Sequence, residues 1–188
     1  MSAFIISFGA LLFYRLTGQF GFNITSNTNQ AADTGSGSIL RIDGLVRNPM
    51  NLSLSELTAL PKTTVNAKLR CVDAPSVIIA QGNWTGVKLS LLLANAGISP
   101  EAVKVAFYAK DGYTTDLTPA TAMGEDIIVA YERDGAPLNE QLRLVVPGTW
   151  GYKWISSLNH IEIVNYDFKG FYERSGFSDE AKIPPSQM

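Results

Sequence analysis

Residues that commonly hold metals or act as nucleophiles are scarce in this sequence. Its 188 residues include one cysteine, Cys71, and one histidine, His160. A single thiol excludes an internal disulfide, and the lack of a Cys-x-x-Cys pair argues against a zinc site built from several protein ligands. No nucleophile elbow or oxyanion signature accompanies the two residues, so a hydrolase dyad has little support. Cys71 is therefore either an inert small core residue or a chemically active group.

A strong charge imbalance and the common nucleotide-binding motifs are also missing. The chain carries 15 basic and 17 acidic residues, so it lacks the electrostatic footprint of a nucleic-acid-binding protein. Neither Gly-x-Gly-x-x-Gly nor Gly-x-x-x-x-Gly-Lys-[Ser/Thr] occurs, which leaves a nicotinamide or nucleotide site without support. We expect no nucleic-acid partner, and any anionic ligand must be held by a few local basic groups.

No apolar run reaches the roughly 20 residues that span a bilayer. Residues 3–14 (AFIISFGALLFY) form a shorter run without a basic n-region or a small-residue cleavage site. This run has three interpretations: a short or tilted membrane anchor, an atypical export signal, or a helix packed on the domain. Residues 23–38 are small and polar, as in a solvated tether. We predict a membrane anchor or export segment at 1–22, a polar linker at 23–38, a domain at 39–188, and a membrane-tethered, extracytoplasmic location.

The remainder of the chain has the composition of a globular domain, with 46% hydrophobic and 17% charged residues. Alternating and apolar stretches predict strands at residues 39–44, 63–72, 103–108, 127–131, 142–146 and 160–165. Helices are predicted at residues 54–60, 89–96 and 119–123, from a capping box at Ser53 and Glu56, a stop at Gly97 and a Thr118-Pro119 cap. Residues 84–86 (Trp-Thr-Gly) are interpreted as a turn. The pattern predicts an α+β fold, mainly β with short helices.

Seven short segments follow one another in a recognisable order. They are residues 40–49 (LRIDGLVRNP), 54–57 (LSEL), 69–72 (LRCV), 83–89 (NWTGVKL), 111–113 (DGY), 130–138 (AYERDGAPL) and 142–153 (LRLVVPGTWGYK). Together they resemble the sulfite-oxidase-type oxidoreductase molybdopterin-binding domain family, over roughly residues 39–180. The resemblance implies that family's fold, with its short helices.

The resemblance also implies a cofactor, molybdopterin with molybdenum. In the family, the dithiolene sulfurs of one molybdopterin and a single protein cysteine hold the metal, and by position that cysteine is Cys71. One protein thiolate suffices because the pterin supplies the other soft ligands. Tyr113 is implied as a catalytic residue in the wall of the substrate pocket. An aromatic ring lying over the edge of the core is the alternative for Tyr113.

The cofactor carries a phosphate, and the resemblance implies which residues bind it. Arg143 and Lys153 are the candidate phosphate ligands, and Arg70 lies nearer the metal. The glycines Gly148 and Gly151 would let backbone N–H groups approach a bulky anionic cofactor. Because Arg143 lies between apolar residues of a predicted strand, a solvent-facing side chain is the alternative for it.

The implied activity is transfer of an oxygen atom to or from a small-molecule substrate. No haem-attachment motif and no cysteines for an iron–sulfur cluster are present, so electrons would pass to or from a membrane or haem electron-transfer partner. The chain departs from the family pattern before Arg143, where a His-Gly pair is missing. It departs again at Ser156 and Ser157, where a basic residue and a tryptophan are usual. These departures favour the alternative function, a non-catalytic binding or interaction module of the same fold with a weakened or lost cofactor site.

Overall fold

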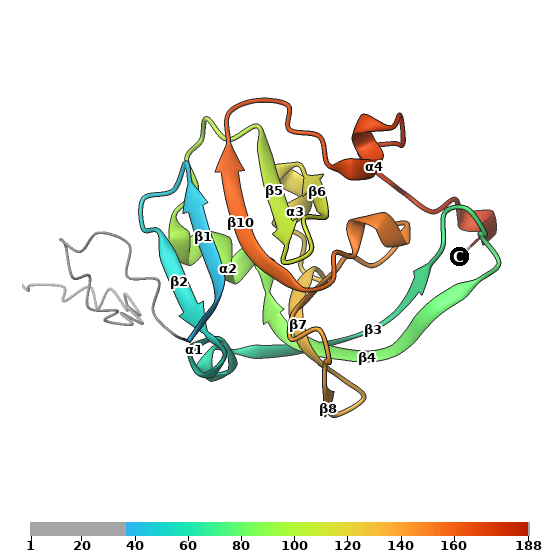
Figure 1. Ribbon diagram of the computed structural model, residues 1–188, viewed down its shortest axis with the longest axis horizontal. Helices are drawn as coiled ribbons and strands as arrows, with labels where there is room; N and C mark the ends of the chain where they lie inside the picture. The colour runs from blue at the N-terminus through green and yellow to red at the C-terminus, as the bar shows by residue number, and fades with distance from the viewer. Residues whose placement is uncertain (1–36, 188) are drawn as a thin grey trace, which may run out of the picture. The chain divides into compact units, whose positions relative to one another are not determined.

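The strands of residues 37–187, the part of the chain that the computed structural model describes, form two sheets (Figure 1). The first has the order β2-β1-β10-β5-β6, with β1 Ser38–Gly44, β2 Met50–Ser53, β5 Lys104–Ala109, β6 Thr114–Leu117 and β10 Leu158–Val164. The second has the order β3-β4-β7-β8, with β9 also paired to β7; its strands are β3 Lys62–Arg70, β4 Ile78–Lys88, β7 Ile128–Arg133, β8 Ala136–Pro137 and β9 Arg143–Val145.

The helices between these strands are short. They are α1 Leu54–Ala59, α2 Leu89–Ala96, α3 Pro119–Ala122 and α4 Phe171–Arg174, with 3-10 turns η1 Gly151–Lys153 and η2 Pro185–Gln187. Buried apolar side chains from both sheets and from α2 form one core cluster. This arrangement confirms the predicted α+β class, mainly β with short helices.

Local capping chemistry places three of the helices where the sequence predicts them. Ser53 and Glu56 form a reciprocal capping box at the start of α1: the Ser53 backbone N–H donates to Glu56 Oε2 at 2.8 Å, and the Glu56 N–H donates to Ser53 Oγ at 3.3 Å. Thr118 caps α3 by accepting from the Thr121 N–H. The last turn of α2 ends at Gly97, whose φ of +69° suits glycine.

The turn predicted at residues 84–86 is wrong, because these residues lie inside β4, an 11-residue strand. The glycine that suggested a turn is required by strand pairing instead. A Cβ atom at Gly86 would lie 2.1 Å from Val129 O on β7, and the β4–β7 register is irregular between Thr85 and Gly86. Trp84 is buried, and its indole N–H donates to Ala67 O at 3.2 Å.

The predicted membrane-tethered location is wrong. Across residues 37–187, no helix combines the length and the apolar character needed to cross a membrane. The segment predicted as an anchor or export signal, residues 1–22, lies outside the described residues, as does the predicted linker up to residue 36. The division of the chain into anchor, linker and domain therefore stays a prediction.

Candidate functional site

Cys71 lies directly after β3, in the loop that joins β3 to β4, and its free thiol is half-buried. The loop is closed by two hydrogen bonds. The Cys71 backbone N–H donates to Val77 O at 3.2 Å, and Arg70 Nη1 donates to Pro75 O at 3.2 Å. The thiol therefore sits in a loop whose ends are fixed, at the tip of the long β3–β4 hairpin that Figure 1 shows curving away from the first sheet.

A second loop, residues 146–151, packs against the strand end that carries Cys71. Arg70 and Trp150 form an isolated parallel β-bridge. The approach is so close that a Cβ atom at Gly151 would lie 2.7 Å from Arg70 O. Gly148 differs, because its φ is +76° and no atom lies within 4 Å of the position its Cβ would take. Gly151 is thus required by packing, whereas Gly148 is exposed and has free space on the Cβ side of its Cα atom.

The C-terminal segment forms the other side of this loop, a contact that the sequence patterns do not predict. The Trp150 N–H donates to Ala181 O at 2.8 Å, and the Ile183 N–H donates to Gly148 O at 2.9 Å. Tyr152 Oη adds a bond to Ser178 O at 2.7 Å. Backbone pairing between loops carries no residue signature, so the sequence contained no usable signal for it.

Tyr113 lies in the turn between β5 and β6 and contacts η1, which continues from that loop. Its hydroxyl donates to Tyr152 O at 2.7 Å, and its ring lies 6.1 Å from Phe171 and 6.3 Å from Tyr172, measured between ring centroids. Burial raises the pKa of Tyr113, and the nearby charge of Glu173 raises it further. Tyr113 is therefore a neutral ring whose hydroxyl is held by η1, next to the loop that contacts the Cys71 strand.

Lys153 is fully buried, and its ammonium group lies among acidic partners of the protein itself. Lys153 Nζ donates to Asp116 O and to Asp116 Oδ1, both at 2.9 Å, and it lies 2.6 Å from Glu173 Oε1. All three side chains are shielded from solvent. The assignment of Lys153 as a phosphate ligand stays a prediction, and this geometry favours a structural role.

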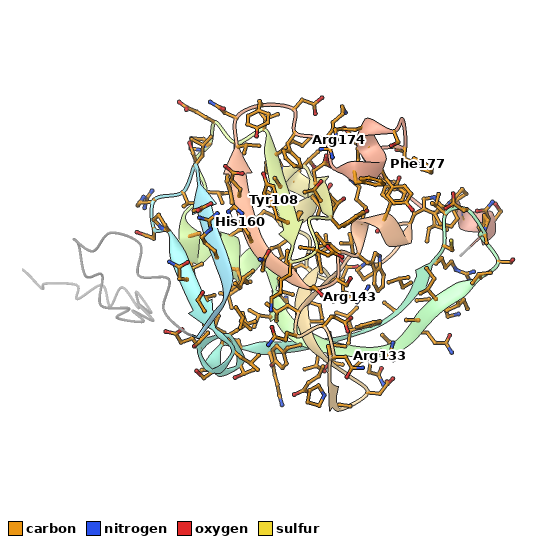
Figure 2. The ribbon with its side chains drawn as sticks, in the orientation of Figure 1. Tyr108, Arg133, Arg143, His160, Arg174 and Phe177 are labelled. Carbon is orange, nitrogen blue, oxygen red and sulfur yellow. The ribbon has the colours of Figure 1, made fainter. Side chains whose placement is uncertain are left out.

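Arg143 is half-buried and is also engaged by the protein. Its Nε donates to Glu140 Oε1 at 2.7 Å, and its Nη1 donates to Trp154 O at 3.1 Å. Its guanidinium carbon lies 6.0 Å from the centroid of the Trp84 ring, and that of Arg133 lies 5.3 Å from the same ring (Figure 2). Burial by itself would raise the pKa of Glu140, but the hydrogen bond and charge of Arg143 hold it below its usual value.

His160 belongs to another part of the fold. It lies on β10, where its Nε2 is 2.7 Å from Asp43 Oδ1 and its ring stacks on Tyr108 at 4.9 Å between centroids. Figure 2 shows Tyr108 and His160 together on the first sheet. The structure therefore brings Arg70, Cys71, Gly148 and Gly151 to one loop. It places Tyr113 against η1, which follows that loop, engages Arg143 and Lys153 internally, and forms no Cys71–His160 dyad.

The residues around Cys71 fit a metal that brings most of its ligands with it. Among residues 37–187, no three or more His, Cys, Asp and Glu side chains gather as a metal site. One accessible soft ligand at Cys71 suits a metal whose other soft ligands belong to an organic cofactor. The exposed glycine at Gly148 and the Arg70 side chain suit an anionic cofactor beside it.

Comparison with known proteins identifies the family. The model of the oxidoreductase molybdopterin binding domain matches residues 34–172. The chain belongs to this family. The match confirms the resemblance seen in the sequence, and the family's cofactor is molybdopterin with molybdenum.

Several members of the family resemble this chain. An uncharacterized oxidoreductase of Bacillus subtilis, YuiH, is 31% identical over 142 residues, which cover 73% of this chain and 71% of that protein. Sulfite oxidase of Arabidopsis thaliana is 28% identical over 77% of this chain and 46% of that protein. The protein-methionine-sulfoxide reductase catalytic subunit MsrP of Gluconobacter oxydans is 32% identical over 68% of this chain and 47% of that protein.

A solved structure has the same fold. The sulfane dehydrogenase SoxCD of Paracoccus pantotrophus superposes with a TM-score of 0.62 at 26% sequence identity, over 68% of this chain and 38% of that chain. This confirms the predicted sulfite-oxidase-like fold. The chain spans about half the length of the sulfite oxidase and MsrP relatives.

Proposed function

We propose that this chain is a molybdenum-dependent oxidoreductase of the sulfite oxidase type, which transfers an oxygen atom to or from a small substrate and uses Cys71 as the protein ligand of the metal. The observation that carries the proposal is the position of the chain's one thiol. It lies half-buried at a strand end, against a loop in which Gly148 is exposed. When bound, the molybdenum cofactor supplies the two-electron oxygen-transfer chemistry.

The chain's own residues bind and orient that cofactor. The Cys71 sulfur ligates the metal. Arg70 donates one N–H to Pro75 O, and within residues 37–187 its other N–H groups have no protein acceptor, so they are available to an anionic group. The backbone at Gly148 admits the bulk of the pterin. Tyr113, held through Tyr152 O, forms a rigid wall beside the loop.

Electrons pass to or from a separate partner in this proposal. The chain has one cysteine and no haem-attachment motif, so it offers no ligands for a haem or iron–sulfur relay of the usual kinds. The name of MsrP describes a catalytic subunit, which implies at least one further subunit in that protein. We propose a partner that carries a haem or a comparable electron-transfer group.

A non-catalytic module is the second candidate, and one observation favours it. Arg143 and Lys153, the two residues predicted to bind the pterin phosphate, already contact acidic side chains of the protein. If Arg70 alone is too weak to hold the phosphate, the fold would persist without its cofactor.

Elemental mass spectrometry distinguishes the two candidates. The wild type and Cys71→Ser are expressed in a host that makes the cofactor, with Ser76→Ala as a control in the same loop. We expect about one molybdenum per chain in the wild type and the control, and none in Cys71→Ser. Iodoacetamide should also alkylate Cys71 more slowly in the metal-loaded protein than in the metal-free protein. If the wild-type protein contains no molybdenum or pterin when the host is rich in the cofactor, the proposal of an enzyme is refuted and the non-catalytic module is favoured.

A further inference from the structure

Three segments that are distant in the sequence meet at the buried ammonium group of Lys153. Lys153 ends η1, Asp116 lies on β6, and Glu173 lies on α4. We call these three residues the Lys153 cluster. Its members have side chains that are 0% exposed. The ammonium has three N–H donors, and three acceptors surround it: Asp116 O, Asp116 Oδ1 and Glu173 Oε1.

Stability alone is a poor explanation for this cluster. Removing charges from water is costly, and well-packed apolar residues of similar volume often give equal or greater stability than a buried ion pair. Glu173 adds a further cost, because its Oε2 is buried without a hydrogen-bond partner among the described residues. A cluster of ion pairs, unlike an apolar contact, fixes the relative orientation of the groups that it joins.

The geometry that the Lys153 cluster fixes is that of the loop beside Cys71. Lys153 follows Trp150, Gly151 and Tyr152 in the sequence, and the first two of these contact the Arg70 backbone next to the thiol. Glu173, on α4, also accepts a hydrogen bond from Thr115 Oγ1 on β6 at 2.8 Å, so its carboxylate links α4 to β6 as well as to Lys153. Gly170, just before α4, packs so closely on β6 that a Cβ atom there would lie 2.4 Å from Thr115 Cα. The cluster therefore joins β6 and α4 to η1, the turn that continues from the loop.

We propose that Lys153 is a positioning residue: its buried ion pairs with Asp116 and Glu173 hold the 146–151 loop against the Cys71 strand end in the geometry that retains the cofactor. The inference rests on the proposed function for the cofactor's presence. It differs from the assignment implied by the family resemblance, because the Lys153 ammonium contacts protein carboxylates instead of the cofactor's phosphate.

The neighbouring lysine provides a matched control. Lys104 is nearly buried and also pairs with Asp116, at 3.2 Å, but its other partners are Asp179 at 3.1 Å and Asp167 at 3.5 Å. None of these belongs to the 146–151 loop. A charge-balanced test variant is Lys153→Met/Glu173→Gln, which leaves the Lys104–Asp116 pair in place. The charge-balanced control is Lys104→Met/Asp167→Asn, which spares Asp179 because that residue lies in the C-terminal segment that pairs with the loop. Glu173→Gln alone is a milder variant that keeps the side-chain shape if the double variant does not fold.

Two measurements test the proposal. The first is the molybdenum content per chain, with the electron paramagnetic resonance spectrum of the one-electron-reduced metal as a report on the geometry at the Cys71 sulfur. The second is the rate at which iodoacetamide alkylates Cys71 in the metal-free protein, which needs no cofactor. Outer-shell partners of metal ligands typically change metal affinity by about 10–100-fold when mutated. We therefore expect an occupancy at least about tenfold lower and faster alkylation in the test variants, with wild-type values in the control.

The outcomes separate this inference from the proposed function. A wild type without molybdenum refutes the proposed function, while the alkylation rates of the metal-free proteins still test the positioning role. A wild type with molybdenum, together with a test variant that matches it in occupancy, resonance spectrum and alkylation rate, overturns the inference. Equal losses in the test and control variants also overturn it, because they would show a general effect of removing buried charges.

Discussion

Replacing Gly151 by alanine is a direct test of the contact between the 146–151 loop and the Cys71 strand. The added Cβ would lie 2.7 Å from Arg70 O and 3.2 Å from Leu69 Cδ2. The first of these is a backbone atom, fixed by the pairing of β3 with β4, so relief requires the loop to move outward. Overpacking of this kind costs about 1–3 kcal/mol.

That cost has a measurable size. In a domain of this length, each kcal/mol shifts the Tm by about 2–4 °C, so Gly151→Ala should lower the Tm of the metal-free protein by about 2–12 °C in scanning calorimetry. Because the loop moves away from Cys71, iodoacetamide should also alkylate the thiol faster, and the molybdenum content should fall.

Gly135→Ala is the control for backbone strain without a clash. Gly135 has a φ of +80°, and no atom lies within 4 Å of the position its Cβ would take. Alanine there should cost about 1–2 kcal/mol from the left-handed backbone alone and leave the alkylation rate unchanged. A Gly151→Ala protein with wild-type Tm and wild-type alkylation would refute the close approach of the two segments.

Two further predictions test the core and the charge network. Trp84→Ala should lower the free energy of unfolding by about 3–5 kcal/mol in denaturant titrations, since it removes a buried ring and leaves Ala67 O without its donor; a loss below about 1 kcal/mol would contradict this. Glu140, whose pKa is lowered through Arg143, contributes stability above its usual pKa of 4.5, and this contribution is lost as the pH falls towards its folded value. Thermal melts from pH 7 to pH 3 should therefore show a shallower decline for Glu140→Gln, and parallel curves would refute the assignment.

The accuracy of the helix predictions follows from the range of the interactions involved. Ser53 with Glu56, Thr118 with Thr121, and Gly97 at the end of α2 are contacts between residues a few positions apart. Their chemistry is the same in any tertiary setting, so the sequence contains the whole signal. The strand β4 was missed for the opposite reason. Gly86 is needed because β7 passes close by, and that neighbour lies elsewhere in the sequence.

The candidate site likewise combines features that the local sequence predicts with contacts that depend on the tertiary structure. The family resemblance implies Cys71 as the thiolate ligand, and that role stays a prediction; the structure places the residue directly after β3, in agreement with the predicted strand end. Two contacts depend on backbone pairing that no local sequence pattern predicts. They join the strand before Cys71 to the 146–151 loop, and that loop to the C-terminal segment.

The sequence by itself determined the family and the mainly β fold with short helices, and it left Cys71 as the one candidate for a thiolate ligand, since these depend on residue type, periodicity and order along the chain. Only the tertiary structure decided which acidic partners the buried basic residues have. A lysine or arginine in a sequence looks equally available for any anion, but Lys153 lies beside Asp116 and Glu173, and Arg143 lies beside Glu140. The physical reason is that the electrostatic partner of a buried charge is set by packing between distant segments, because a charge removed from water requires a nearby opposite charge.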